Sequence, residues 1–215
     1  MACHCVFKKW ITFTFLFYHM KRLLYFLSLM LLISCSEQAS EEGDILFQQG
    51  DYEQAVRLYS DYLEINPGDI KTLYNRGRAY EEMELYELAF KDFVAVLEED
   101  GENLQANLSV GSYYYNKQDY DEALHFFNQA IKYHQQNSQA YFLRARAHHK
   151  QGKIDDAMEG YNKAISLDGE FGEAYLYRGA LKTYLKQSRG ACEDYHQAQA
   201  LNVEKAQTAV ESFCK

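Results

Sequence analysis

The 215-residue sequence contains a single proline, Pro67. Because proline breaks helix interiors, this scarcity favours long helices. Positive charge is also scarce: 22 Lys and Arg stand against 31 Asp and Glu, a formal net charge of −9. Residues 1–35 hold four of the basic residues and no acidic one, so the rest of the chain carries 13 more acidic than basic residues. A nucleic-acid-binding surface needs a basic stripe that replaces condensed counterions, so the composition argues against nucleic acid as a partner.

The sequence lacks the patterns that carry catalysis or metal binding. It has no glycine-rich phosphate loop and no G-x-S-x-G nucleophile motif. His148 and His149 are adjacent, so on a helix they point about 100° apart and cannot hold one ion from one face. His125, His134 and His196 have no histidine partner four residues away. We therefore predict no enzyme activity, no metal site and no cofactor.

Long apolar runs are also missing, except near the N-terminus. The run over residues 23–34 is shorter than the about 20 residues that a membrane-spanning helix needs. Two basic residues precede it, which is the order found in a secretory signal. We expect residues 20–35 to be a signal peptide. A second apolar run upstream is not required by such a signal, so we interpret residues 1–19 as an over-extended start and Met20 as the true one.

The end of this signal, Leu-Ile-Ser-Cys at residues 32–35, resembles the lipobox of bacterial lipoproteins. The resemblance implies that Cys35 is lipidated on its thiol and becomes the mature N-terminus, which anchors an exported protein to a membrane. Ser36 in place of Asp favours the outer membrane, on its periplasmic or surface face. Residues 36–40 would then be a short tether. An ordinary signal, or an uncleaved anchor with an incidental cysteine, is the alternative.

A 34-residue pattern repeats five times along the rest of the chain. One small residue marks each copy: Ala55, Ala89, Ala123, Ala157 and Ala191. Twelve residues before each alanine stands another small residue: Gly43, Gly77, Gly111, Ala145 and Gly179. Four residues after each alanine stands an aromatic: Tyr59, Phe93, Phe127, Tyr161 and Tyr195. A fixed period of this length with this signature predicts an array of paired helices.

Local signals mark the turns inside these pairs. Asp51 and Asp119 are placed to cap the second helix of their repeats, and a Gln or Glu three residues after each would complete a capping box. Gly50 and Gly152 lie in the turns between the two helices of a pair, where a positive φ is expected. The sequence thus predicts both the helices and their connections.

The repeated residues resemble the tetratricopeptide repeat (TPR) family over about residues 41–201, and all five units agree in phase. The resemblance implies an all-α fold, an α-solenoid of about five stacked helix pairs. His148 and Lys182 stand where the first three repeats have an apolar or aromatic residue, and Ser188 replaces the opening aromatic of the last second helix, so the fifth repeat is the least regular. An apolar stripe then follows in residues 202–215, which we expect to form a capping helix over the last repeat: Val203, Ala206, Val210 and Phe213.

The same resemblance implies a binding groove along the first helices of the pairs. The groove positions fall on Tyr74, Arg78, Leu108, Ser112, Phe142, Arg146, Leu176 and Ala180, with Tyr115 and His149 one turn further on. An apolar floor flanked by arginines suits a peptide with apolar anchors and an acidic group. We therefore expect a scaffold that binds a protein or peptide of the cell envelope. The Lys and Asn clamp of some chaperone-binding TPR proteins is not reproduced.

Other interpretations stay open at this point. Tyr74 and Phe142 would also suit simple packing between neighbouring repeats. The 19 tyrosines make binding of a glycan or another small ligand an alternative function, since aromatic faces stack on sugar rings. A purely structural subunit of an envelope assembly is a third possibility.

Two cysteines remain in the repeat region. Cys192 lies early in the second helix of the fifth repeat, and Cys214 lies late in the capping helix. If those helices pack antiparallel, the two cysteines are neighbours, and an exported protein can oxidise them. We predict a disulfide, which would stabilise the fold by about 3 kcal/mol through closure of a loop of about 22 residues. The alternative is two buried, unbonded thiols.

Overall fold

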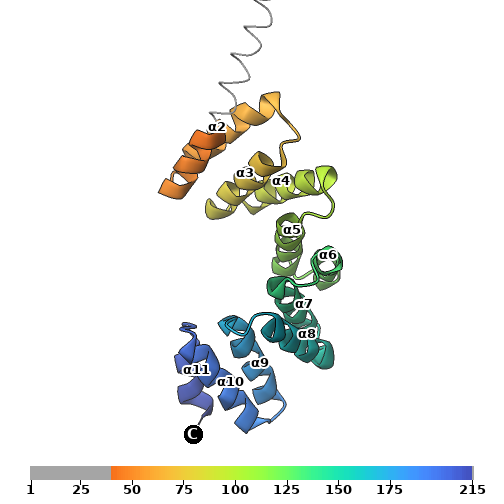
Figure 1. The fold of residues 1–215 in the computed structure, drawn as a ribbon, viewed down its shortest axis with the longest axis vertical. Helices are drawn as coiled ribbons and strands as arrows, with labels where there is room; N and C mark the ends of the chain where they lie inside the picture. Colours follow the sequence, from red (N-terminus) through yellow and green to blue (C-terminus); the bar gives the residue numbers. More distant parts are fainter. Residues whose placement is uncertain (1–39, 215) are drawn as a thin grey trace, which may run out of the picture. The chain divides into compact units, whose positions relative to one another are not determined.

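The computed structural model describes residues 40–214, and Figure 1 labels the helices α2 to α11 along this part of the chain. The predicted start, signal peptide, lipidation site Cys35 and tether residues 36–39 lie outside the described residues. Ser40, which we assigned to the tether, is helical and buried, and its hydroxyl lies 2.9 Å from the Thr72 hydroxyl. None of the helices in the described part of the chain combines the length and apolar character that a membrane span requires.

The described residues form helices and no strands, which confirms the predicted all-α repeat fold. Residues 40–49 are helical. The elements that follow are α2 (Tyr52–Ile65), α3 (Ile70–Glu82), α4 (Tyr86–Glu99), α5 (Leu104–Asn116), α6 (Tyr120–Tyr133), α7 (Ser138–Lys150), α8 (Ile154–Leu167), α9 (Gly172–Tyr184), α10 (Ser188–Ala200) and α11 (Ala206–Phe213). The first residues of α3, α5, α7, α9 and α11 are evenly spaced along the chain, at the interval of the repeated alanines. The period of the sequence is therefore the period of the structure.

The chain divides between residues 84 and 85 into two compact units. In the first unit, α2 packs against α3. In the second unit, each helix from α4 to α11 packs against the next one in the chain, and α5 also contacts α7. Helix pairs therefore stack in sequence order within the second unit, which holds most of the predicted groove positions.

The small residues of the repeat allow two helices to approach closely. Gly111 of α5 faces the ring of Phe127 of α6, where a Cβ on the glycine would come within 2.5 Å of a ring carbon. The equivalent contact recurs in the first and fifth repeats. In the fourth repeat the position is Ala145, and there Gly160 of α8 supplies the space, since its Cβ would lie 2.8 Å from that of the alanine. The small residue of the first helix and the aromatic residue of the second helix therefore pack against each other.

The turns match the predicted caps only in part. Asp51 and Asp119 each accept a hydrogen bond of 3.3 Å from the backbone N–H three residues on, as predicted for N-caps. The predicted capping boxes are wrong, because the N–H of each Asp already donates to a carbonyl at the end of the preceding helix, at 2.9 Å. Gly50 and Gly152 have the expected positive φ, of 81° and 73°. The other turns at this repeat position use residues with side chains: Glu84, Gln118 and Lys186.

The C-terminal helix α11 packs on α10 but is not as deeply buried as the predicted stripe implies. Val203 lies in the turn before α11, Ala206 is buried, and Phe213 is 54% exposed. Phe213 stands one repeat length after Gly179 and so replaces the small residue of the other first helices. In the described part of the chain no second helix covers it, which is why its ring stays open to solvent. Cys214, directly after α11, is joined by a disulfide to Cys192 of α10, and their Cα atoms are 5.4 Å apart.

Candidate binding groove of the second unit

The predicted groove residues of the first unit, Tyr74 and Arg78, lie on α3. Arg78 already has acidic partners on its own helix: its Nε lies 3.2 Å from Glu81 Oε2 and its Nη2 lies 3.7 Å from Glu82 Oε1. Burial lowers the pKa of Arg78, but a hydrogen bond with Tyr74 and the two carboxylates outweigh it and raise that pKa overall. A ligand carboxylate would have to displace these partners, so Arg78 is not a prepared anion site.

Arg146 of α7 has a different environment, made of aromatic rings. Its guanidinium carbon lies 4.8 Å from the centroid of the Tyr115 ring, 5.2 Å from Tyr177 and 5.6 Å from Phe142. These rings come from α5, α9 and α7 itself. Among residues 40–214 Arg146 forms no ion pair, and its buried Nε has no hydrogen-bond partner. We call this arrangement of Tyr115, Phe142, Arg146 and Tyr177 the arginine cage.

Two predicted groove residues belong to the core instead. Phe142 is 1% exposed, because the rings of Phe171 and Tyr177 pack over it with centroids 4.8 and 5.4 Å away. Leu108 is 7% exposed and belongs to the same apolar cluster. Their assignment to an open groove floor is therefore wrong. Of the remaining positions in this unit, Ser112 and Leu176 are partly buried and Ala180 is exposed.

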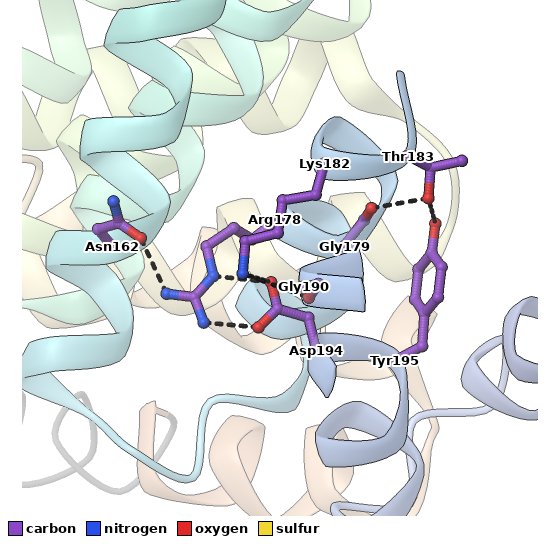
Figure 2. Close-up of polar contacts among 8 residues, drawn as sticks. All are labelled: Asn162, Arg178, Gly179, Lys182, Thr183, Gly190, Asp194 and Tyr195. Atoms are coloured by element: carbon purple, nitrogen blue, oxygen red, sulfur yellow. Dashed lines mark hydrogen bonds and ion pairs between the residues drawn. The ribbon is translucent and has the colours of Figure 1, made fainter. Parts of the chain in front are cut away.

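An open groove of about 810 Å³ lies between α9 and α11. Along α9 its lining residues follow the spacing of one helix face: Glu173, Leu176, Tyr177 and Ala180. Along α11 and the turn before it the lining residues are Asn202, Val203, Glu204, Lys205, Thr208, Ala209, Ser212 and Phe213. Tyr195 of α10 also lines the groove, and its hydroxyl lies 2.9 Å from Thr183 Oγ1 (Figure 2). Two helix faces and a tyrosine thus form a mainly apolar slot.

Tyr177 belongs to both features, since it lines the groove and faces Arg146. The arginine cage and the groove are therefore neighbouring parts of one site. Our sequence prediction named Leu176 and missed Tyr177. A signal was present, because the preceding repeats have Leu143 and Ser109 at this position, so the tyrosine departs from the repeat.

Two titratable groups near the cage, His149 and Tyr161, are uncharged near neutral pH. His149 Nδ1 lies 3.4 Å from the Tyr161 hydroxyl. Burial lowers the pKa of His149 and raises the pKa of Tyr161 above its ordinary value. In the described residues, no three His, Cys, Asp or Glu side chains are gathered as a metal site would require. The chemistry of the arginine cage is therefore that of a guanidinium among aromatic rings.

A buried charge cluster fixes α9 against α10 (Figure 2). Asp194 is 3% exposed and accepts hydrogen bonds from Arg178 Nε at 2.9 Å and Arg178 Nη2 at 2.6 Å. Lys182 Nζ lies 2.8 Å from the same carboxylate, and Arg178 Nη1 donates to Asn162 of α8 at 2.8 Å. Because Arg178 and Lys182 both have partners within the protein, the cluster serves to hold together the helices that carry the groove.

Comparison with known proteins agrees with this architecture. The tetratricopeptide repeat model matches residues 74–131 and 108–174, and a TPR repeat model matches residues 43–84. A crystal structure of MamA is similar at 24% identity and a TM-score of 0.67, over 77% of this chain and 96% of that one. MamA 41-end from Desulfovibrio magneticus RS-1 is similar at 20% identity and a TM-score of 0.70, over 78% and 94%.

A third similar structure is that of YrrB, described as a TPR protein with an unusual peptide-binding site. Its identity is 19% and its TM-score 0.64, over 80% of this chain and 90% of that one. At such identities the similarity concerns the fold. Since the family matches together run from residue 43 to residue 174 and the helix pairs keep the period of the repeat throughout, the chain belongs to the tetratricopeptide repeat family.

Proposed function

We propose that this chain is a binding scaffold that holds a short segment of another protein on the second unit, with a carboxylate of the segment on Arg146. The observation that carries the proposal is the arginine cage: a guanidinium held among rings from α5, α7 and α9, with no acidic partner among the described residues. The shared fold of YrrB, which has a peptide-binding site, supports a peptide as the class of ligand.

The cage prepares Arg146 for an anion. Contacts of a cation with ring faces contribute about 0.5–2 kcal/mol each and hold the guanidinium in one orientation. They do not neutralise it, and a partly desolvated charge without a counterion is unfavourable. A carboxylate would neutralise the charge of the guanidinium and form the paired, charge-assisted hydrogen bonds for which this planar group is suited. An acidic side chain or a C-terminal carboxylate supplies this group.

The experiment is a selection followed by a binding measurement. Dodecapeptides selected from a random display library on the described domain are labelled with fluorescein, and their affinity is measured by fluorescence anisotropy. Arg146→Gln should weaken binding about tenfold or more, because a hydrogen-bonded ion pair is lost. Arg189→Gln, which changes an exposed arginine of α10, is the matched control and should bind normally. Thermal unfolding followed by circular dichroism verifies that both variants fold.

Two results would reject this function. Equal affinity of the Arg146→Gln variant and the control would exclude Arg146 as the anion site. Absence of any selected peptide, together with specific binding on a glycan array, would favour the small-ligand alternative.

We also propose that the scaffold works at the cell envelope as a lipoprotein, held by a lipid on Cys35. The motif at residues 32–35 after an apolar run supports this location. Metabolic labelling with an alkyne analogue of palmitate should mark the wild-type protein and leave Cys35→Ser unmarked. Equal labelling of the two proteins would reject the anchor, and membrane fractionation would then report the compartment.

A further inference from the structure

We propose that the groove between α9 and α11 receives an apolar side chain of the bound segment, and that this groove exists only while Cys192 and Cys214 are bonded. The inference rests on the proposed function and adds a second contact and a condition to it. The site would then have two parts: the arginine cage for a carboxylate, and the groove for an apolar anchor next to it.

Helix α11 supplies one wall of the groove and is weakly held by its own packing. The helix has eight residues, and Ala206 at its start is its one buried residue. Isolated helices shorter than about 12–15 residues are marginal in water. Phe213, at the other end, is 54% exposed and reaches the Tyr195 ring at a centroid distance of 5.9 Å. Non-covalent packing therefore secures the beginning of α11 much better than its end.

The disulfide lies at the end of α11 that is far from the buried Ala206. The chain enters α11 through a turn in which the Val203 N–H donates to the Ala198 carbonyl of α10 at 3.0 Å. Cys214 stands at the opposite end and is bonded to Cys192, also on α10. The covalent bond thus closes the end of α11 that packing leaves open. Without it, the wall that carries Ala209 and Phe213 is free to leave α10.

The residues that line the groove determine which side chain it can accept. Leu176, Tyr177 and Ala209 present apolar or aromatic surface to it. Glu173 and Glu204 also line it against a single cation, Lys205, so the charge of the lining is negative overall and disfavours a second carboxylate inside the groove. The acidic group of the segment must then lie on the Arg146 side of Tyr177. We infer a segment in which an aliphatic or aromatic residue stands next to an acidic one.

Reduction would open the groove by a balanced exchange. A dithiol attacks the Cys192–Cys214 bond, the sulfur–sulfur bond breaks, and two thiols form on the protein. The dithiol gives up two electrons and two protons and closes into its own disulfide. By linkage, a saturating segment that prefers the bonded form makes the protein disulfide harder to reduce by the same factor by which reduction weakens binding.

The test compares oxidised and dithiothreitol-reduced protein by hydrogen–deuterium exchange and by anisotropy with the selected dodecapeptides. Reduction should speed amide exchange in α11 about tenfold or more, the signature of local opening, and leave α5 to α8 unchanged. The same treatment should weaken peptide binding about tenfold, a free-energy change of about 1.4 kcal/mol. A Cys192→Ser/Cys214→Ser variant should bind weakly with or without dithiothreitol, which controls for other effects of the reductant.

The outcomes separate this inference from the proposed function. Unchanged α11 exchange or unchanged affinity on reduction would overturn the inference. If Arg146→Gln still weakened binding in that case, the proposed function would stand alone. If Arg146→Gln bound normally while reduction weakened binding, the groove would stand and the anion site would fall. If no dodecapeptide bound the oxidised protein, both would be rejected.

Discussion

The buried charge cluster between α9 and α10 gives the sharpest prediction about stability. Replacing Asp194 with Asn removes the carboxylate that receives Arg178 and Lys182 and leaves two cations facing each other. Removing one partner of a buried ion pair costs about 3–5 kcal/mol. The side chains of Arg178 and Lys182 are partly buried, so they can turn their ends toward water. We therefore expect the lower end of that range, about 3 kcal/mol.

The measurement is thermal unfolding together with hydrogen exchange. For a chain of this size 1 kcal/mol corresponds to about 2–4 °C, so Asp194→Asn should lower the melting temperature by about 6–12 °C. In a repeat array each repeat contacts only its neighbours, so the loss of protection should concentrate in α9, α10 and α11. Glu193→Gln, an exposed carboxylate on the same helix, is the matched control. A loss for Asp194→Asn no larger than that of the control would refute the reasoning.

Further predictions concern packing and pH. In a urea titration, Gly111→Ala should lower the free energy of unfolding by roughly 2 kcal/mol, because overpacking costs about 1–3 kcal/mol and the fully buried Phe127 ring cannot move aside. Gly169→Ala, in an exposed turn, is the control and should leave that free energy nearly unchanged. Burial lowers the pKa of His148 and His149, so below the ordinary value of 6.5 the unfolded state takes up protons that the folded state refuses. The free energy of unfolding should therefore fall as the pH drops from about 7.5 to about 5.5. It should fall less in a variant with Gln at both positions. Equal slopes of this free energy against pH in the two proteins would exclude these histidines as the cause.

The helix pairs and their period could be predicted because the contacts that create them are local in the chain. Gly111 and Phe127 lie on α5 and α6, two consecutive helices joined by a short turn. A glycine on one helix and an aromatic residue on the next therefore recur in the sequence at the period of the repeat. The same holds for the positive φ of Gly50 and Gly152. At Gln118 a residue with a side chain adopts the positive φ of the turn, so the sequence has no glycine to indicate it.

The C-terminal end was predictable in outline and not in detail. An apolar stripe indicated a capping helix, but it could not show that Val203 lies in a turn or that Phe213 remains exposed. Lys182 was visible as an irregularity of the fifth repeat. The structure explains why a lysine stands there: Lys182 forms an ion pair with the buried Asp194, which requires that α9 and α10 pack side by side. Irregular residues in a repeat therefore mark places where partners must be sought in the structure.

By itself the sequence determined an array of evenly repeated helix pairs, since that pattern records contacts within a pair. The tertiary structure decided which residues come together in the proposed binding site. Tyr115, Arg146 and Tyr177 follow one another at an interval one helical turn shorter than the repeat, because neighbouring first helices meet with this offset. Comparing equivalent repeat positions therefore led to Phe142, which is buried, and passed over Tyr177, which joins the arginine cage to the groove.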